Sequence, residues 1–286
     1  MRRRRKQLAA ANLKLGGISL PSYCKKINFL AFILLCMPAV YSISLMSICS
    51  IRKAAKYEAF GNEVKDPVLQ ILLINFKWFM YIIVYPTSVN FIVLLLCTFC
   101  LRCSSLISNM VNEISGITPE KFGPSMQIHI LRVKARVDES LCNLQDVFSL
   151  PILFIIVAHL LSCSTSIGWF LYYGFKHYHC AMRVQAAFFG INSSVSLIIM
   201  FWVAGGVPGK LQRLKETFFN KSHLRLILSP LMNEPQFKRE ILDKPDFVFT
   251  GYDIISLRRR TLFVLFGSMI TYTVLVVSTR DFFKEY

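Results

Sequence analysis

Long uncharged and mostly apolar runs divide this chain. Five intervals contain no Asp, Glu, Lys or Arg and are 25, 24, 29, 26 and 19 residues long: Ile27–Ile51, Trp78–Leu101, Val147–Phe175, Val184–Gly209 and Thr261–Thr279. A helix of about 20 residues crosses the hydrocarbon core of a bilayer. The pattern therefore predicts five membrane-spanning helices, at about residues 28–50, 78–101, 148–173, 186–208 and 261–279.

A second apolar pattern lies outside these runs. Six residues recur at intervals of three and four, which places them on one helical face: Ile130, Val133, Val137, Leu141, Leu144 and Phe148. No strong helix breaker occurs before Pro151, so we expect one helix to continue from this segment into the third span. Leu211, Leu214 and Phe218 repeat the spacing in a second long segment.

These two segments, 102–147 and 210–260, are predicted to form a cytoplasmic helical domain. For the second segment, a helix lying on the membrane surface is the alternative. The remaining parts are a basic amino-terminal segment, 1–26, and the transmembrane bundle, within 27–286. The predicted fold class is an all-α polytopic membrane bundle whose long helices extend into the cytoplasm.

Composition agrees with a membrane protein. Apolar residues make up 54% of the 286 residues, and the mean hydropathy is +0.49, which is above the usual range for a water-soluble domain. The first run is a full span without a small-residue cleavage site, so we expect it to be retained and not removed as a signal peptide.

Basic residues indicate the orientation. With the amino terminus inside, the cytoplasmic segments hold 24 of the 33 Lys and Arg residues and the outer segments hold 9. Cytoplasmic loops carry the excess of basic residues, so we predict a cytoplasmic amino terminus and an extracellular carboxyl terminus. The run Arg2–Lys6 and the triplet Arg258–Arg260 then lie beside anionic lipid, and the net charge of +17 needs no nucleic-acid partner.

The usual marks of catalysis and ion-coupled transport are missing from the sequence. The five runs contain no charged residue, although such residues mark proton relays and ion pathways. No Walker loop, G-x-S-x-G elbow or H-E-x-x-H motif occurs. We therefore expect neither an enzyme nor a pump, and no cofactor. His159, Asn90 and Asn192 are the strongest polar groups in the spans, and we expect them to bond across helix interfaces.

Two groups of residues have the spacing of metal ligands. Cys97, Cys100 and Cys103 match an iron–sulfur run, and the segment HYHC at 177–180 offers three zinc ligands. Neither group has an evident fourth ligand, so we predict no metal site. The three cysteines are expected to pack as small apolar residues, or, for Cys103, to carry an acyl chain.

The last span carries a polar cluster in its outer half. Thr271, Tyr272, Ser278 and Thr279 lie there, and Tyr272, Val276 and Thr279 share one helical face. A mostly apolar face with a few hydroxyl groups can line a conduit that conducts only when it is wetted, while a plain packing face is the alternative. The predicted pore and gate residues are Tyr272, Val276, Ser278 and Thr279.

Aromatic residues gather at the outer ends of two other spans. Tyr81, Tyr85, Trp169 and Tyr172 have amphipathic rings that suit a small-molecule pocket. Anchoring at the lipid–water interface is the alternative for each of them. We take these four residues as the predicted ligand pocket.

The carboxyl-terminal half resembles a known receptor family. Phe249-Thr250, then Gly267, then Thr271-Tyr272 followed by five mostly apolar residues resemble the final helix of arthropod gustatory receptors, which are related to insect odorant receptors. The segment LCNLQDVFSLPILFIIVAHLLSCSTSIGWFLYY resembles the third-from-last span of that family. The similarity covers roughly residues 132–279.

This resemblance implies a function. It implies a taste-type chemoreceptor, a cation channel of low selectivity that a small-molecule tastant opens. The channel would be a homo- or hetero-tetramer whose final helices surround the pore, with a ligand pocket in the outer half of each subunit and helices packed in a cytoplasmic anchor. The expected location is the plasma membrane of chemosensory neurons.

Three features depart from the family pattern. Ser278-Thr279 stand where the family has Gln-Phe, and Asp253 stands where it often has glycine. The five predicted spans correspond to the last five of seven, so the first two are missing. A non-conducting scaffold or truncated receptor remnant is therefore an alternative. A G-protein-coupled receptor is another, although its Asp-Arg-Tyr and Asn-Pro-x-x-Tyr elements do not occur.

Overall fold

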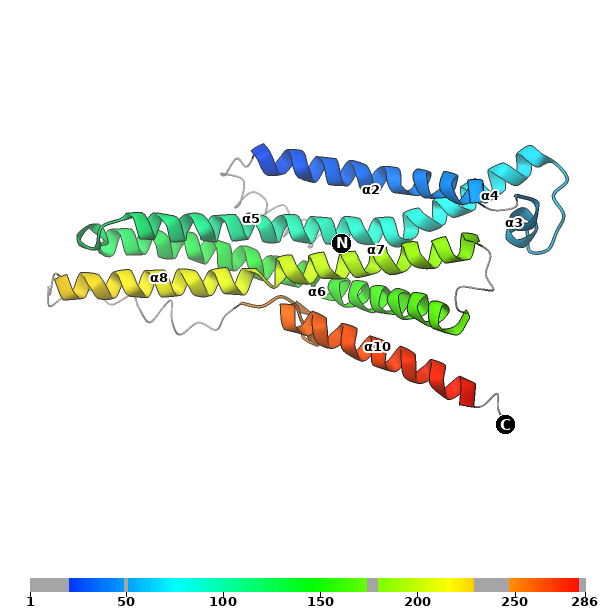
Figure 1. Cartoon of the computed structure of the whole chain (residues 1–286). Coiled ribbons are helices and arrows are strands. Elements are labelled where there is room, and N and C mark those ends of the chain that lie inside the picture. Colours follow the sequence, from blue (N-terminus) through cyan, green and yellow to red (C-terminus); the bar gives the residue numbers. More distant parts are fainter. Residues whose placement is uncertain (1–20, 49–50, 174–179, 229–246, 283–286) are drawn as a thin grey trace. The chain divides into compact units, whose positions relative to one another are not determined.

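The computed structural model describes residues 21–48, 51–173, 180–228 and 247–282, and these residues are mostly helical (Figure 1). The helices are α2 (Pro21–Ile48), α3 (Ile51–Glu58), α4 (Pro67–Ile82), α5 (Ser88–Gly116), α6 (Pro124–Tyr173), α7 (Cys180–Ala204), α8 (Val207–Leu228) and α10 (Arg259–Phe282). A π-helical turn, η1 (Ile83–Thr87), joins α4 to α5, and a short 3-10 turn, η2 (Pro119–Lys121), precedes α6. Strands β1 (Thr250–Gly251) and β2 (Ile255–Ser256) form an antiparallel hairpin before α10.

Five helical stretches of the described chain are long and apolar enough to cross a membrane. They are Lys25–Ile48, Pro67–Gly116, Pro124–Leu171, Met182–Leu228 and Arg259–Val276. The all-α prediction is confirmed at this level, and each of the five stretches overlaps one of the five predicted spans. Several are much longer than a span, because α5, α6 and the α7–α8 pair continue beyond the apolar runs.

The second of these stretches begins earlier than the sequence analysis predicted. α4 starts at Pro67, which suits the first helical position, and Asp66 caps the helix by accepting a hydrogen bond of 2.9 Å from Val68 N. The uncharged run began only at Trp78, because Lys77 interrupts it. A single lysine ended the apolar run without ending the helix.

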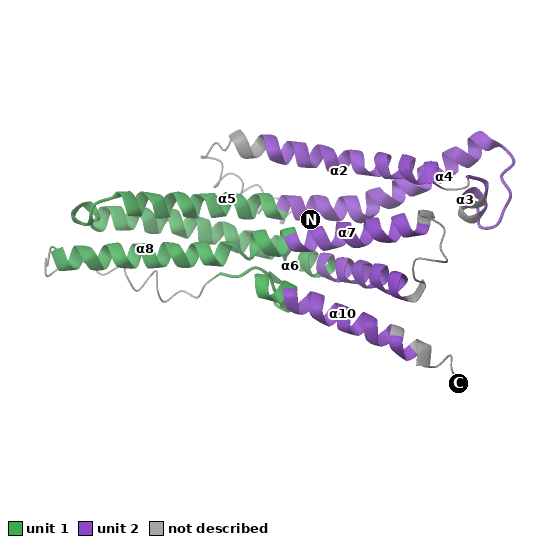
Figure 2. Ribbon diagram, in the orientation of Figure 1, with its two compact units in different colours: residues 1–19, 96–154, 199–262 green, residues 20–95, 155–198, 263–286 purple. Residues whose placement is uncertain are grey.

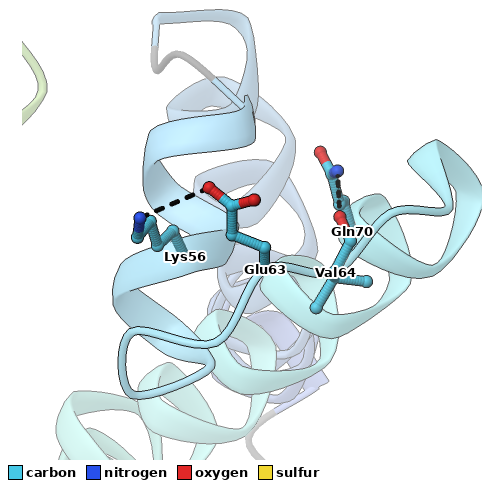
Figure 3. Close-up of polar contacts among 4 residues, drawn as sticks. All are labelled: Lys56, Glu63, Val64 and Gln70. Atoms are coloured by element: carbon cyan, nitrogen blue, oxygen red, sulfur yellow. Dashed lines mark hydrogen bonds and ion pairs between the residues drawn. The ribbon is translucent and has the colours of Figure 1, made fainter.

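The segment between α2 and α4 contains the short helix α3. Two contacts organise the turn that follows α3 (Figure 3). Lys56 Nζ lies 3.4 Å from Glu63 Oε1, and Gln70 Nε2 donates a hydrogen bond of 2.6 Å to Val64 O. The ion pair is more than half exposed, so it contributes little to stability.

The chain divides into two compact units (Figure 2). Unit 1 comprises residues 1–19, 96–154 and 199–262, and unit 2 comprises residues 20–95, 155–198 and 263–286. Helices α5, α6 and α7 each contribute residues to both units. Unit 1 contains both of the segments, 102–147 and 210–260, that the sequence analysis assigned to a cytoplasmic domain.

The core of unit 1 follows the periodic stripe of α6. Val133 is half-buried. The other five residues of the stripe are buried: Ile130, Val137, Leu141, Leu144 and Phe148. α6 is a single helix, as predicted from the absence of a breaker. The second stripe is also confirmed, because Leu211, Leu214 and Phe218 are all buried, and the Phe218 ring meets the Phe122 ring edge-on at 5.2 Å. α8 is therefore packed in unit 1 along this face.

Basic side chains of α8 bond to α5 and η2, which are neighbouring elements of unit 1. Lys210 Nζ lies 3.0 Å from Ser108 Oγ, and Lys221 Nζ donates to the carbonyl of Ser115 at 3.3 Å, in the last turn of α5. Arg225 donates to the carbonyl of Glu120 in η2. The last carbonyls of a helix lack partners within the helix and carry partial negative charge, so cations stabilise them.

Unit 2 has the opposite distribution of polar and apolar groups. Large apolar side chains point outward from several of its helices, among them Phe29, Phe32, Phe76, Leu161 and Ile191. Polar side chains are buried instead: Ser42, Thr87, Asn90, His159, Ser166, Ser193, Ser196 and Thr273. Water would disfavour both features, whereas a hydrocarbon environment favours them. The five apolar helices and this distribution fit a multi-pass membrane protein.

Replacement of a stripe residue tests the core of unit 1. Leu141 is fully buried, so Leu141→Ala should lower the free energy of unfolding by about 2–5 kcal/mol through lost burial and a new cavity. The thermal midpoint of the detergent-purified chain measures this. Leu224→Ala is the control, because Leu224 is exposed on α8, and it should leave the midpoint nearly unchanged. Equal midpoints for the two variants would contradict the assigned core.

Candidate functional site

Helix α10 buries one narrow stripe. Leu262, Met269 and Thr273 are buried, and their spacing of seven and four residues keeps them on one face. Thr273 Cγ2 would lie 3.7 Å from a Cβ placed on Gly168 of α6, so the two helices approach closely at this point. Only 17% of the apolar stretch of α10 is buried, and most of its surface is free for other contacts.

The predicted pore residues lie beside this stripe and are exposed. Tyr272 has 66% of its surface accessible, and Val276, Ser278 and Thr279 are exposed too. The hydroxyls of Ser278 and Thr279 donate to carbonyls of α10 itself, at 2.9 and 3.0 Å, so they need no further partner. The phenol of Tyr272 is too far from its own backbone to do so.

The family-motif residues of the last span behave differently from one another. Thr271 Oγ1 donates to the carbonyl of Gly267 at 2.9 Å, which accounts for a hydroxyl at this position. A Cβ at Gly267 would meet nothing within 4 Å. Close packing within a single chain therefore does not explain that glycine.

The other motif pair, Phe249 and Thr250, belongs to the β1–β2 hairpin of unit 1. Phe249 is fully buried, and its carbonyl accepts a hydrogen bond of 2.7 Å from Leu257 N. Gln145 of α6 binds Thr250 three times. Its Nε2 donates to Thr250 O at 2.9 Å and to Oγ1 at 2.6 Å, and its Oε1 accepts from Thr250 N at 3.0 Å. One turn further along α6, Ser149 Oγ accepts from Tyr252 N at 2.9 Å.

We call Gln145, Ser149 and the backbone of residues 250–252 the hairpin clamp. A Cβ at Gly251 would lie 3.2 Å from the backbone nitrogen of Leu153, which is tighter than most Cβ contacts, so a larger residue would require the hairpin or α6 to shift. The clamp fixes the hairpin from which α10 starts. Sequence reasoning missed Gln145, because its partner is 105 residues away and no local pattern marks such a pair.

The predicted ligand residue Tyr85 is the centre of a polar network in unit 2. Pro86 disfavours helical geometry at the preceding residue, and Tyr85 has an extended backbone, with φ −147° and ψ 125°, inside η1. Its hydroxyl lies 3.0 Å from Ser193 Oγ, 3.3 Å from His159 Nδ1 and 3.5 Å from the carbonyl of Ala158. The network thus joins η1, α6 and α7.

A second polar contact joins α5 to α7. Asn90 Nδ2 donates to Asn192 Oδ1 at 3.0 Å, as expected for polar groups that bond across a helix interface. Within the described chain, five buried polar atoms near these contacts have no hydrogen-bond partner: Thr87 Oγ1, Asn90 Oδ1, His159 Nε2, Asn192 Nδ2 and Ser196 Oγ. Unmade bonds of this kind are costly in an apolar surrounding. The set contains donors and acceptors that can bind water or a polar ligand.

Several aromatic rings lie next to this polar region. Tyr85 stacks on Phe189 with centroids 6.0 Å apart, and Tyr81 meets the same ring edge-on at 5.6 Å. Tyr41 of α2 lies 4.4 Å from the Phe188 ring. Two predicted ligand residues, Tyr81 and Tyr85, therefore both contact the Phe189 ring. The sequence analysis did not single out Phe189, because it lies among other apolar residues of α7 and nothing in the sequence distinguishes it from them.

The structure defines the surroundings of the other two predicted ligand residues, Trp169 and Tyr172, less fully. Trp169 is half-buried on α6. Tyr172 falls in the last turn of α6, and its side chain lies outside the described part of the chain. The structure therefore supports a candidate ligand site of two predicted residues together with His159, Ser193 and Phe189.

The structure describes only one of the two groups that have metal-ligand spacing. Cys97, Cys100 and Cys103 are buried along α5, which fits packing and leaves the Cys103 thiol inaccessible to an acylating enzyme. The segment 177–180 lies outside the described side chains. Among all the described residues, these cysteines included, no three His, Cys, Asp or Glu side chains come together in a group that could hold a metal ion.

Comparison with known proteins identifies no family. No family model matches the chain, and a search of curated proteins finds no match. The resemblance to gustatory receptors therefore rests on the residues named in the sequence analysis.

The hairpin clamp can be tested by removing its amide. Gln145→Ala leaves the backbone groups of Thr250 without their partner, so we expect the free energy of unfolding to fall by about 1–3 kcal/mol. Thermal unfolding of the purified chain measures the change. Gln212→Ala is the matched control, because Gln212 is exposed on α8 and bonds only Glu216. If the clamp does not stabilise the fold, the two variants will have the same thermal unfolding midpoint.

The polar network can be tested with a tyrosine pair. Tyr85→Phe removes the hydroxyl that joins His159 and Ser193, and we expect a loss of about 1 kcal/mol in the free energy of unfolding. Tyr81→Phe removes a hydroxyl from an exposed ring on the neighbouring helix and should change stability little. Thermal midpoints in the same detergent compare the two. A larger effect at Tyr81 would rule out Tyr85 as the centre of the network.

Proposed function

We propose that this chain is a subunit of a gustatory-type chemoreceptor, a cation channel of low selectivity that opens when a small molecule binds, with α10 lining the pore. The observation that carries the proposal is the exposure of the face of α10 bearing Tyr272, Val276 and Thr279. In a single chain, this face places a phenol on the outside of an apolar helix.

The chemistry of this face suits a gate. Because the hydroxyls of Ser278 and Thr279 bond to their own helix, the surface they offer is close to apolar. Several copies of such a face around an axis would form a narrow conduit that excludes ions until it widens and wets. Tyr272 would then reach water or a neighbouring subunit instead of lipid. A homo- or hetero-tetramer in the plasma membrane of chemosensory neurons is the proposed assembly.

The ligand would bind at the Tyr85 network. The unpartnered atoms His159 Nε2, Asn90 Oδ1 and Asn192 Nδ2 offer both donors and acceptors, and Phe189 offers an aromatic wall. Such a combination suits a small amphipathic tastant. Helix α6 carries His159 and, nearer its start, the Gln145 side of the hairpin clamp. A ligand that favours one position of α6 would thereby bias the start of α10.

Currents recorded from cells test the proposal. The full chain, alone and with candidate partner subunits, is expressed with a tag at either terminus, and the side of each tag is mapped before a tastant screen. We expect a cytoplasmic amino terminus, an extracellular carboxyl terminus and a tastant-evoked cation current. Tyr272→Ala should change the ratio of resting to evoked current at least severalfold, because a large side chain is lost from the constriction.

Val274→Ala is the matched control. Val274 is exposed on α10 but points away from the Tyr272 face, so currents should resemble those of the wild type. A cytoplasmic carboxyl terminus would exclude this channel family. Equal effects of the two variants would exclude the proposed pore face. Correct topology without current under any stimulus or partner would instead favour a scaffold or receptor remnant.

A further inference from the structure

A stacked arginine and tryptophan lie at the start of α10, within unit 1. The guanidinium carbon of Arg259 is 4.2 Å from the ring centroid of Trp202, on α7. Such stacking fixes the direction of an otherwise flexible side chain. Trp202 is itself 55% exposed, and interfacial tryptophans usually sit at headgroup level.

The arginine segment passes close to two glycines that follow α7, and its approach to Gly205 is too close for a larger residue without a shift. A Cβ at Gly205 would lie 3.0 Å from the carbonyl oxygen of Leu257 and 3.2 Å from Arg259 N. At Gly206, a Cβ would come within 3.6 Å of Arg259 Nη2. The backbone of the segment is also held by the hydrogen bond from Thr261 N to the carbonyl of Arg258, at 3.0 Å. The triplet is thus positioned by the fold.

Within the described residues, no acidic side chain neutralises this triplet, although the Arg259 guanidinium stacks on Trp202. Arg258, Arg259 and Arg260 are all exposed, and none forms an ion pair with any part of the described chain. The nearest acidic residue in the sequence is Asp253, whose carboxylate accepts a hydrogen bond of 2.8 Å from Thr250 Oγ1 instead. Three arginines without a counter-ion among the described residues are suited to bind an external anion.

The neighbouring surface indicates which anion. Directly after the triplet, α10 exposes the apolar side chains of Phe263 and Val264, and α7 exposes Ile198 and Ile199 shortly before Trp202. An anion bound here is therefore next to surface that avoids water. A free phosphate ion has no apolar part that could contact that surface, whereas a phospholipid carries its phosphate directly above acyl chains.

We propose that Arg258, Arg260 and the Arg259–Trp202 stack form a binding site for the headgroup phosphate of an anionic phospholipid. Arg258 and Arg260 supply the charge, and Arg259 is held in place by Trp202. The acyl chains would lie along the exposed apolar side chains of α10. This site is independent of conduction, and it assigns the triplet to lipid instead of to an ion pathway.

Equilibrium binding of a labelled lipid tests the site. The full chain is purified in a non-ionic detergent and mixed with fluorescent short-chain phosphatidylserine. The fluorescence anisotropy of the lipid probe is recorded at a series of protein concentrations. Each arginine near an anionic lipid contributes about 1 kcal/mol, so the double variant R258Q/R260Q should bind about 30-fold more weakly than the wild type. The single variants should each bind about fivefold more weakly, and they serve if the double variant does not purify as a monodisperse protein.

A matched pair supplies the control. R132Q/R136Q removes the same charge from exposed positions on α6, also in unit 1, and should bind the lipid as the wild type does. Trp202→Ala should weaken binding, while Trp202→Phe, which keeps a ring, should weaken it less. Equal losses in both arginine pairs would overturn the proposal. So would equally tight binding of labelled phosphatidylcholine, or displacement of the probe by inorganic phosphate as readily as by unlabelled phosphatidylserine.

Discussion

A hydrocarbon solvent offers no hydrogen bonds, and the arrangement of unit 2 follows from that constraint. Every polar group must find a partner inside the protein or leave the apolar surface. Ser268, Thr271 and Ser278 on exposed faces of α10 meet this requirement by donating to carbonyls of their own helix. Longer polar side chains such as Asn90 and His159 cannot do so and are buried at helix interfaces instead. The atoms there that stay unpartnered then become candidates for ligand binding.

Helix α6 meets two environments along its length. In unit 1 its apolar stripe, with Leu141 as an example, is buried as in a water-soluble protein. In unit 2 the same helix exposes Val157 and Leu161 and buries His159. Apolar side chains are therefore both buried and exposed in this second part of the helix, where Ile156 is buried too. Because Gln145 lies in the first part and His159 in the second, the same helix carries residues of both the hairpin clamp and the Tyr85 network.

The sequence predicted best those features that depend on local periodicity. The stripes of α6 and α8 were predicted residue by residue, since burial repeats with the helical period. Charge-free runs located the apolar helices but not their ends, because Lys77 can sit within a helix as well as beside one. The partners of Gln145 and Tyr85 were not predictable. Thr250 is 105 residues from Gln145, and Ser193 is 108 residues from Tyr85. Only the packing of the folded chain brings these pairs into contact.

The turn before α10 bears on one difference from the gustatory receptors that the sequence resembles. Asp253 stands where the family often has glycine, and its φ of 56° is in the left-handed region that glycine adopts most easily. Aspartate tolerates this region better than most residues, because its short side chain can bond locally. Here it accepts the hydroxyl of Thr250, which is also held by Gln145. The aspartate therefore keeps the backbone geometry that a glycine would have allowed, and the hairpin clamp needs no different turn to position α10.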